Sequence, residues 1–288
     1  MVSQYQKLAM AYFHPALKED PFNPEDSARF FYLGYQYKEA YEMLTSHIAM
    51  KRGLAIIYGD IGLGKSSLLG LLRKRIVGND LFSSFLVGEV LDPSQPTDAE
   101  FTREMLRAFG QRPVASTRSE LSNEFIIFLQ KTAREGKVPL LLVDEAQCLT
   151  YDALERLRIF LNYSLDDHRI LQIVMFGQLE LQEKVAKKRN LGSRVRFTNN
   201  LEPFMSAAQV KDLIYHRLKV AGLPPGIELF TDDAIAMIFK QSEGVPRSIV
   251  NICSLCFDVA PRFNKRKVDT DIVEHVVGTM MQEYKGRA

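Results

Sequence analysis

The residues with the clearest chemical capacity are the glycines, lysine and serine of one short loop. Residues 59–66 read GDIGLGKS and fit the phosphate-loop pattern G-x-x-x-x-G-K-[ST]. Glycine lets the backbone curl so that successive N–H groups point at phosphate oxygens. Lys65 can reach the β- and γ-phosphates of a nucleoside triphosphate, and the Ser66 hydroxyl can bind Mg²⁺. The alternative is a chance glycine turn before a core helix. The predicted nucleotide-binding residues of the loop are Gly59, Asp60, Gly62, Leu63, Gly64, Lys65, Ser66 and Ser67.

Two neighbouring carboxylates, Asp144 and Glu145, follow the most apolar stretch of the chain, residues 138–143. Carboxylates at the carboxyl end of a buried parallel strand lie where ligands bind in open α/β sheets. Asp144 fits Mg²⁺ ligation, directly or through water, together with Ser66. Glu145 fits a general base that polarises the attacking water. The alternative is an acidic helix N-cap.

A polar amide, Gln178, follows a further apolar stretch at residues 170–176. At the end of a buried strand, this side chain could hold the lytic water near the γ-phosphate. The alternative is an ordinary turn glutamine.

These groups need a sheet to bring them together, and the hydrophobic pattern predicts one. Strands are expected at residues 54–58, 84–90, 138–143, 170–176 and 197–201. Helical patterns lie between them, at residues 66–72, 97–109, 120–134, 151–163 and 179–188, and another precedes them at residues 37–50. This alternation predicts a three-layer α/β fold with a parallel sheet.

After Pro203 the strand patterns stop, and only amphipathic helices are expected. They cover residues 207–221, 231–242, 246–259 and 269–284. We therefore predict three parts: an N-terminal arm and helix that pack on the core (1–50), a nucleotide-binding core (51–204) and a small all-helical domain (205–288).

Composition excludes several classes of protein. Of the 288 residues, 46% are hydrophobic and 25% are charged, which is typical of a globular domain. No apolar run approaches the ~20 residues that span a bilayer, so no membrane insertion is expected. The absence of a signal-peptide pattern and the presence of only three cysteines predict a cytoplasmic protein. A net charge of +2 permits nucleic-acid binding without requiring it.

Several tempting patterns have simpler interpretations. Cys253 and Cys256 form a single C-x-x-C pair inside an apolar helical pattern, which favours core packing over metal binding. The five histidines are scattered along the chain. The basic runs at 187–189 and 262–267 are typical of a solvated face, with phosphate contact as the alternative. The aromatic residues at 30–32 fit either base stacking or the core.

Taken together, these motifs resemble those of AAA+ ATPases of the ExeA-like group. The pieces that carry the resemblance are Gly59 to Ser66, Asp144-Glu145-Ala146-Gln147, Gly177-Gln178-Leu179-Glu180-Leu181, Gly244-Val245-Pro246-Arg247, Asp20-Pro21-Phe22 and Arg29-Phe30-Phe31-Tyr32-Leu33. The group includes general-secretion ATPases and transposition regulators of the TniB, TnsC and MuB type. The resemblance covers nearly the whole chain and implies a P-loop AAA+ core with a helical lid.

The resemblance also implies a role for each matching residue. Lys65 and Ser66 look like the Walker A pair, and Asp144 and Glu145 look like the Walker B metal-site residue and catalytic base. Gln178 lies where the family has its first sensor, although many AAA+ proteins use Asn there. Arg247, at a lid-helix start, looks like the second sensor, with a surface arginine as the alternative. The resemblance also places Pro246 and Arg247 among the nucleotide-binding residues. Arg194 looks like an arginine finger, with Arg189 and Arg196 as rivals. The implied catalytic set is Lys65, Glu145, Gln178, Arg194 and Arg247, with ATP and Mg²⁺ as cofactors.

An arginine that acts on a neighbouring subunit requires an oligomer. The resemblance therefore implies a ring or helical filament, with ATP at subunit boundaries and bound between core and lid. Hydrolysis removes the γ-phosphate that such arginines contact, so it would favour disassembly.

Three biological roles remain open. The first is a transposition target-selection or regulatory ATPase that assembles on double-stranded DNA, with transposase or target-selector proteins as partners. Its candidate DNA contacts, each of which also fits an ordinary surface residue, are Arg103, Arg112, Thr117, Arg118 and Lys131. The second is the cytoplasmic ATPase of a general-secretion membrane complex, whose relatives usually continue into a spanning helix, whereas this chain stops at Ala288. The third is a replication-type AAA+ regulator, which would normally carry a winged-helix module. A metabolite kinase is a weaker fourth.

Overall fold

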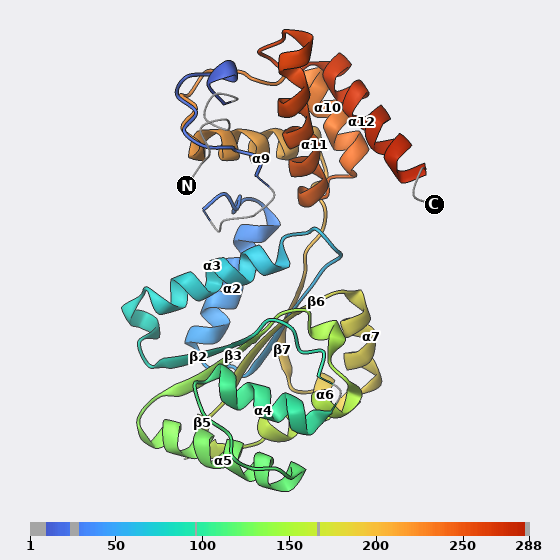
Figure 1. The fold of residues 1–288 in the computed structure, drawn as a ribbon. Helices are drawn as coiled ribbons and strands as arrows, with labels where there is room; N and C mark the ends of the chain where they lie inside the picture. Colours follow the sequence, from blue (N-terminus) through green and yellow to red (C-terminus); the bar gives the residue numbers. More distant parts are fainter. Residues whose placement is uncertain (1–9, 24–28, 96, 166–167, 286–288) are drawn as a thin grey trace. The chain divides into compact units, whose positions relative to one another are not determined.

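The computed structural model describes residues 10–23, 29–95, 97–165 and 168–285 (Figure 1). These residues form two compact units. One unit comprises Gly34–Ile61 and Lys65–Leu201 and is called the sheet unit below. The other combines the described residues up to Leu33 with Gly62–Gly64 and the chain from Glu202 onward, and is called the helical unit. The three-part division drawn from the sequence remains a prediction.

The sheet unit is built on a five-stranded sheet in which every neighbouring pair of strands is parallel. The strand order is β2-β3-β6-β1-β7, so β1 lies between β6 and β7. The bounds are Leu54–Tyr58 for β1, Phe85–Val90 for β2, Val138–Val143 for β3, Gln172–Gly177 for β6 and Val195–Asn200 for β7. The predicted α/β fold with a parallel sheet is therefore confirmed.

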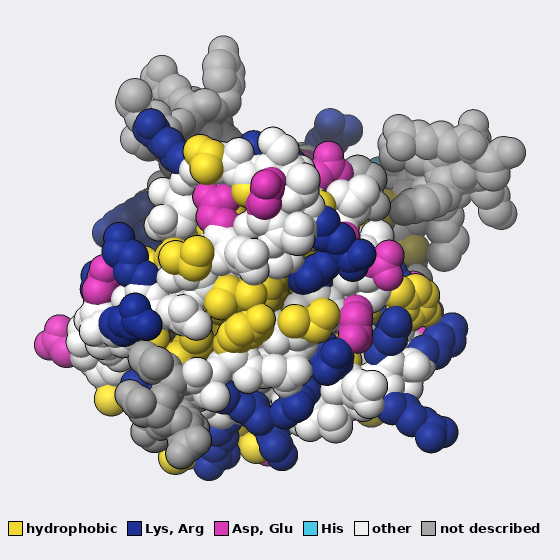
Figure 2. All heavy atoms as spheres, turned by 90° about the horizontal axis from the view of Figure 1, so that it is seen from below, with side chains coloured by type: hydrophobic (Ala, Val, Ile, Leu, Met, Phe, Trp, Pro, Cys, Tyr) yellow, Lys and Arg dark blue, Asp and Glu magenta, His cyan; other side chains and the backbone are white. Residues whose placement is uncertain are grey.

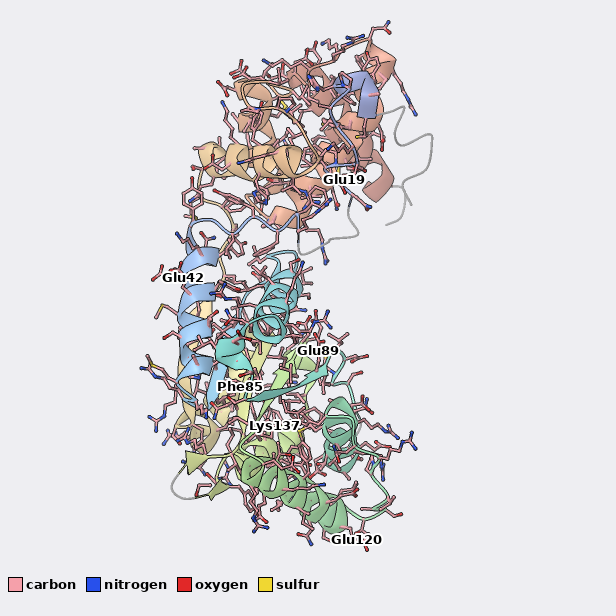
Figure 3. All side chains as sticks on the ribbon, turned by 90° about the vertical axis from the view of Figure 1, so that its left-hand side faces the viewer. Glu19, Glu42, Phe85, Glu89, Glu120 and Lys137 are labelled. Atoms are coloured by element: carbon pink, nitrogen blue, oxygen red, sulfur yellow. The ribbon has the colours of Figure 1, made fainter. Side chains whose placement is uncertain are left out.

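Burial explains why these strands are so apolar. Every residue of β1, β3 and β6 is buried, because both faces of the central strands are covered. The edge strands are less buried, and Phe85 and Glu89 of β2 are both partly exposed (Figure 3). Along the other edge strand, β7, partly buried and exposed residues alternate.

Helices cover both faces of the sheet (Figure 1). On one side lie α2 (Gln36–Ala49) and α3 (Lys65–Val77), which contact each other as well as the strands. On the other side, alternate residues of β1, β3 and β6 share one apolar core with the remaining helices of the unit. These helices are α4 (Asp98–Ala108), α5 (Arg118–Arg134), α6 (Tyr151–Phe160), α7 (Leu179–Lys187) and α8 (Arg189–Gly192). Two single turns, η1 (Asp80–Phe82) and η2 (Ala146–Cys148), complete the unit.

Threonine side chains mark the starts of three helices in the sheet unit. Thr97, Thr117 and Thr150 each accept a hydrogen bond from a backbone N–H in the first turn of α4, α5 and α6. Thr117 also forms a full capping box with Glu120. Thr97 as a helix start was predicted, but α5 begins at Arg118, two residues earlier than expected.

The sequence pattern did not predict the shortest elements. A hairpin of β4 (Ser164–Leu165) and β5 (His168–Arg169) lies between α6 and β6. Two-residue strands and the four-residue helix α8 are too short to show a hydrophobic period. The helix after the phosphate loop also extends to Val77, beyond the predicted Leu72.

The helical unit contains α9 (Ala207–Val220), α10 (Asp232–Ser242), α11 (Pro246–Val259) and α12 (Thr270–Lys285), with a short turn η3 (Ala260–Phe263). The predicted run of helices after Pro203 is therefore confirmed. The N-terminal segment packs on these helices, since the ring of Phe13 stacks on that of Phe257 with centroids 4.0 Å apart. Cys253 and Cys256 are both 0% exposed free thiols in this core, as core packing predicts.

Candidate nucleotide-hydrolysis site

The phosphate-loop lysine is held at the carboxyl end of the inner strand β1. α3 begins at Lys65, whose Nζ donates to the carbonyl oxygens of Gly59 at 2.8 Å and Asp60 at 2.9 Å. The Gly59 N–H donates to the carbonyl oxygen of Gly177 at 3.2 Å, which ties the loop to the end of β6. Lys65 is only 6% exposed. A buried ammonium at a helix N-terminus is suited to anionic phosphate.

The later glycines of the loop, Gly62 and Gly64, belong to the helical unit. Both have positive φ values, 83° and 79°, which favour glycine. A Cβ atom at Gly62 would lie 3.0 Å from Val245 and 3.1 Å from Arg247, and one at Gly64 would lie 3.1 Å from the ring of Phe31. The loop is therefore packed too closely for larger residues at these two positions.

Ser66 and Asp144, the predicted metal ligands, are in contact. The Ser66 hydroxyl hydrogen-bonds to the Asp144 carboxylate, which is 5% exposed. Burial raises the pKa of Asp144, and the bonds from Ser66 and the Glu145 N–H oppose this rise. A buried carboxylate beside a hydroxyl fits a divalent cation, because the cation would compensate the desolvated charge. Among the described residues no cluster of three or more His, Cys, Asp or Glu could hold a metal ion.

Glu145, the predicted base, lies directly after β3 in a left-handed backbone conformation, with φ 46° and ψ 36°. This conformation is uncommon for a residue other than glycine. The Glu145 carboxylate accepts a hydrogen bond from Gln147 Nε2, and Gln147 Oε1 accepts one from the backbone N–H of Gln178 at 3.0 Å. Glu145 and Gln178, which come from the ends of β3 and β6, are thus linked through one amide side chain.

No role for Gln147 is predicted from the sequence. Its only signal was its place two residues after Glu145 in the motif that carries the family resemblance. Gln178 itself precedes α7 directly, beside the phosphate loop, because Gly177 pairs with Tyr58 in the sheet. The structure therefore brings the ends of β1, β3 and β6 together with the side chains expected to act on a triphosphate.

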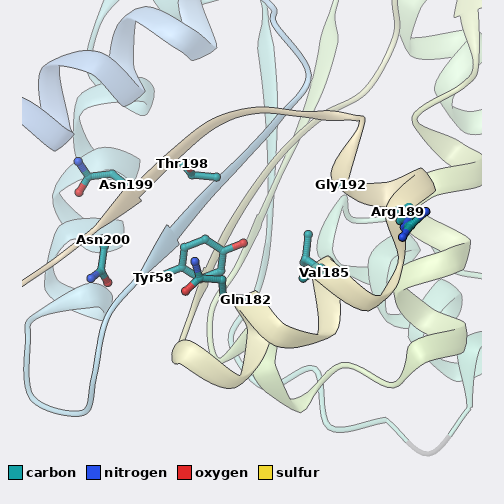
Figure 4. Close-up of a pocket in the computed structure, with 9 residues that line it drawn as sticks. Tyr58, Gln182, Val185, Arg189, Gly192, Thr198, Asn199 and Asn200 are labelled. Carbon is teal, nitrogen blue, oxygen red and sulfur yellow. The ribbon is translucent and has the colours of Figure 1, made fainter.

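Arg194 lies near the amino ends of the strands, whereas the phosphate loop lies at their carboxyl ends. It comes directly before β7, whose Val195 pairs with Leu54 at the amino end of β1. The five residues of β1 separate the amino end of the strand from the phosphate loop by about 17 Å, which exceeds the length of an arginine side chain. Of the rivals, Arg196 is exposed on β7 and Arg189 lines a pocket of about 300 Å³ beside β7 (Figure 4).

That pocket lies between β7 and α7 and is separate from the residues that hold Lys65. Besides Arg189 its lining combines polar side chains with the apolar Val185 and Ala186. It includes Tyr58, Gln182, Thr198, Asn199 and Asn200 (Figure 4). Burial raises the pKa of Tyr58 to about 12, so its phenol stays neutral.

Arg247, the predicted second sensor, and Pro246, a predicted nucleotide-binding residue, begin α11 in the helical unit. Pro246 occupies the first helical position, where a missing N–H costs least. The Arg247 N–H donates to the carbonyl oxygen of Gly62 at 3.1 Å, and the residue is exposed. Its backbone is therefore fixed against a loop glycine, while its side chain is accessible.

The five predicted DNA contacts have different environments. Arg118 Nε donates to the buried carboxylate of Asp98 at 2.8 Å, and Arg103 Nη2 donates to the carbonyl oxygen of Ala115 at 3.3 Å. Thr117 is the cap of α5, so three of the five have structural partners. Arg112 and Lys131 are exposed. Figure 2 views the molecule from the side on which α5 lies in Figure 1, and a group of hydrophobic side chains there is surrounded by Lys and Arg together with Asp and Glu side chains.

Comparison with known proteins agrees with this geometry. Residues 48–185 match the family described as AAA domain. General secretion pathway protein A of Aeromonas hydrophila is 29% identical over 240 residues, which is 82% of this chain and 42% of that protein. The chain thus spans less than half the length of this relative.

Solved structures show the same fold. The Aeropyrum pernix ORC1 protein, solved in complex with DNA, matches with a TM-score of 0.66 at 17% identity. The match covers 90% of this chain and 68% of the ORC1 chain. The Aeropyrum pernix ORC2 protein, solved with ADPNP and ADP, has a TM-score of 0.64 at 15% identity and covers 88% and 72%. Within the described part of the chain, no helix is both long and apolar enough to cross a membrane.

Proposed function

We propose that this chain couples ATP hydrolysis to self-assembly on double-stranded DNA. The match of residues 48–185 to the family described as AAA domain supports the ATPase part of this proposal. The main support is the distance between Arg194 and the phosphate loop of the same chain. An arginine at the amino ends of the strands can act only on ATP that is bound to a neighbouring copy. Hydrolysis would then depend on assembly.

Each step of hydrolysis has a proposed residue. Lys65 neutralises the β- and γ-phosphates. Ser66 and Asp144 would hold Mg²⁺, which would supply Lewis-acid polarisation of the phosphate oxygens. Glu145 accepts a proton from the attacking water, and the Gln178 side chain orients that water. Arg247 would contact the phosphates as the second sensor.

The charges at the amino and carboxyl ends of the strands support a head-to-tail assembly. Five cations lie around the amino ends of β1, β6 and β7. They are Lys51, Arg52, Arg169, Arg194 and Arg196. None of them forms an ion pair with a carboxylate of another described residue, and burial and the neighbouring Arg196 and Arg194 lower the pKa of Arg169. After the carboxyl ends of β1, β2 and β3 lie Asp60, Asp92, Asp144 and Glu145. Contact between the cationic side of one copy and the acidic side of the next is heterologous and generates rings or helical filaments.

DNA is the proposed surface for this assembly. The similarity in fold to ORC1, a protein solved in complex with DNA, supports the idea, as do the exposed side chains of Arg112 and Lys131. Within this role we favour a transposition regulator that selects target DNA, with a transposase or target-selector protein as its partner. All five candidate contacts from the sequence, including Arg103, Thr117 and Arg118, stay proposals.

A second candidate function has a specific observation in its favour. The 29% identity to General secretion pathway protein A extends over 82% of this chain. An ATPase of a secretion complex would use the same nucleotide site with a protein partner in place of DNA.

Fluorescence anisotropy on a labelled duplex separates the two functions. The protein is titrated with ATP, with ADP and without nucleotide, over a series of salt concentrations. We expect binding that requires ATP and weakens steeply with salt, because phosphate contacts release counterions. An absence of binding at low salt would reject the DNA role and favour a protein partner.

A further inference from the structure

Gln147 makes two hydrogen bonds that join opposite parts of the hydrolysis site. Its Nε2 donates to Glu145 Oε2 at 2.5 Å, and its Oε1 accepts from the Gln178 N–H at 3.0 Å. A carboxylate only accepts and a backbone N–H only donates, so the two partners fix which way the amide points. Gln147 is therefore oriented at both ends.

The turn that carries Gln147 is itself clamped by α7. Lys184 Nζ donates to the carbonyl oxygens of Gln147 at 2.6 Å and Leu149 at 2.9 Å. At Gly177, a Cβ atom would lie 2.7 Å from Leu181 and 3.3 Å from the Gln147 nitrogen, so the end of β6 packs directly on the turn. Because of these contacts, a displacement of the β6 end would be transmitted to Gln147.

We propose that Gln147 is a positioning residue for hydrolysis, which fixes the Glu145 carboxylate relative to Gln178 at the end of β6. The proposal rests on the roles of Glu145 and Gln178 given above. The bond to Oε2 leaves Oε1 of Glu145 to accept from the attacking water. The bond from the Gln178 N–H sets the distance between the base and the residue that orients the water. Two groups from separate strands then meet the water as one unit.

This arrangement predicts an effect on turnover and little effect on substrate binding. The two groups that bind the Gln147 side chain, the Glu145 carboxylate and the Gln178 backbone N–H, lie outside the phosphate loop. Loss of the amide would leave the Glu145 carboxylate free to rotate, and small errors in the placement of a base are costly. We expect kcat to fall about 10- to 100-fold, with KM for ATP changed less than about twofold.

The test compares variants of similar volume in the full chain. Gln147→Met removes both hydrogen bonds, whereas Gln147→Glu keeps an acceptor for the Gln178 N–H but cannot donate to Glu145 and adds a like charge beside it. Steady-state ATPase assays give kcat and KM, and thermal melting reports folding. Both variants should show the fall in kcat while melting close to wild type. Cys148→Ser, a change at the next, exposed residue, should keep wild-type kcat.

Three results would overturn the proposal: wild-type kcat in either Gln147 variant, a rise in kcat in either variant, or a loss confined to KM. Should one variant be too unstable to assay, the other gives the same measurement. Failure of the proposed function looks different. In that case the wild-type chain does not hydrolyse ATP, or Glu145→Gln turns over ATP as fast as wild type.

Discussion

The Ser66 hydroxyl is hydrogen-bonded to the Asp144 carboxylate, although β6 lies between the strands that lead to these two residues. Ser66 is in the first turn of α3, after β1, and Asp144 follows β3 directly. The bond therefore closes the site across the end of β6, where Gln178 directly precedes α7. Any ligand that bridges Ser66 and Asp144 would lie against the ends of all three strands.

This relationship predicts how the site responds to loss of one hydroxyl. Ser66→Ala removes an oxygen ligand for Mg²⁺ and leaves the buried Asp144 with only the Glu145 N–H as a hydrogen-bond donor, so kcat/KM should fall about 10- to 100-fold. The Mg²⁺ concentration needed for half-maximal activity should rise. A titration with MgCl₂ at fixed ATP measures both quantities. Ser66→Thr, which keeps the hydroxyl, is the matched control and should retain most activity. The same Mg²⁺ dependence in Ser66→Ala and wild type would contradict a metal role for Ser66.

A second prediction concerns Arg194 and its action on a neighbouring copy. Arg194→Ala should lower kcat about 10³- to 10⁵-fold, the usual contribution of an arginine finger. The same change at Arg189 or Arg196 should cost far less. The steady-state ATPase rates of the three variants decide between the rivals.

Mixing two inactive variants tests whether the arginine acts between subunits. An Arg194→Ala copy has its own Glu145, and a Glu145→Gln copy has its own Arg194, so a mixed assembly contains complete sites. Activity should reappear when the two are combined. Combining Glu145→Gln with the double variant, which lacks both groups, should give none. If the first mixture stays as inactive as its components, Arg194 does not complete a neighbour's site.

The sequence was sufficient to predict some elements to the residue and left others undetected, for physical reasons. The strands at 54–58 and 138–143 have the predicted bounds because both faces are covered, and a buried strand is apolar throughout. The sheet order could not be read locally, since nothing within residues 172–177 specifies that they lie between β1 and β3. Gln147 was overlooked for a similar reason. Its role depends on the turn after Glu145 and on the end of β6, two regions that are distant in sequence.

A third prediction follows from an ion pair that no local pattern indicated. Asp98 at the start of α4 accepts from Arg156 Nη2 at 2.7 Å and from Arg118 Nε at 2.8 Å. The side chains of Asp98 and Arg156 are only 10% and 12% exposed. Burial raises the pKa of Asp98, but the bonds and charges of the two arginines outweigh it, so the net shift is downward.

Removing this carboxylate should destabilise the sheet unit, because it leaves the Arg156 guanidinium buried without its anion. Asp98→Asn should lower the free energy of unfolding by about 3–5 kcal/mol, measured by urea denaturation. Glu104→Gln is the matched control on the same helix. Its exposed pair with Arg107 should contribute no more than about 1 kcal/mol. Equal losses in the two variants would show that burial of the Asp98 pair has no special weight.

The last prediction concerns a buried histidine and the acid side of the stability curve. His47 on α2 is 3% exposed, and its Nε2 has no hydrogen-bond partner among the described residues. Burial lowers its pKa from the ordinary 6.5, the bond to the Gly53 backbone opposes this, and the nearby charge of Arg52 lowers it further. The folded chain therefore takes up a proton at this site less readily than the unfolded chain does.

The sign follows from that difference. Above about pH 6.5 His47 is neutral in both states and contributes no pH dependence. As the pH falls below this value, the unfolded chain gains the proton first, so stability decreases by up to about 1.4 kcal/mol per pH unit until the folded pKa is reached. Urea denaturation between about pH 7.5 and 5.5 should show a shallower loss in His47→Phe than in wild type. Some slope should remain in the variant, because burial also lowers the pKa of His216. His275→Gln, at an exposed position on α12, should leave the wild-type slope unchanged, and an equal slope in His47→Phe and wild type would exclude His47 as its source.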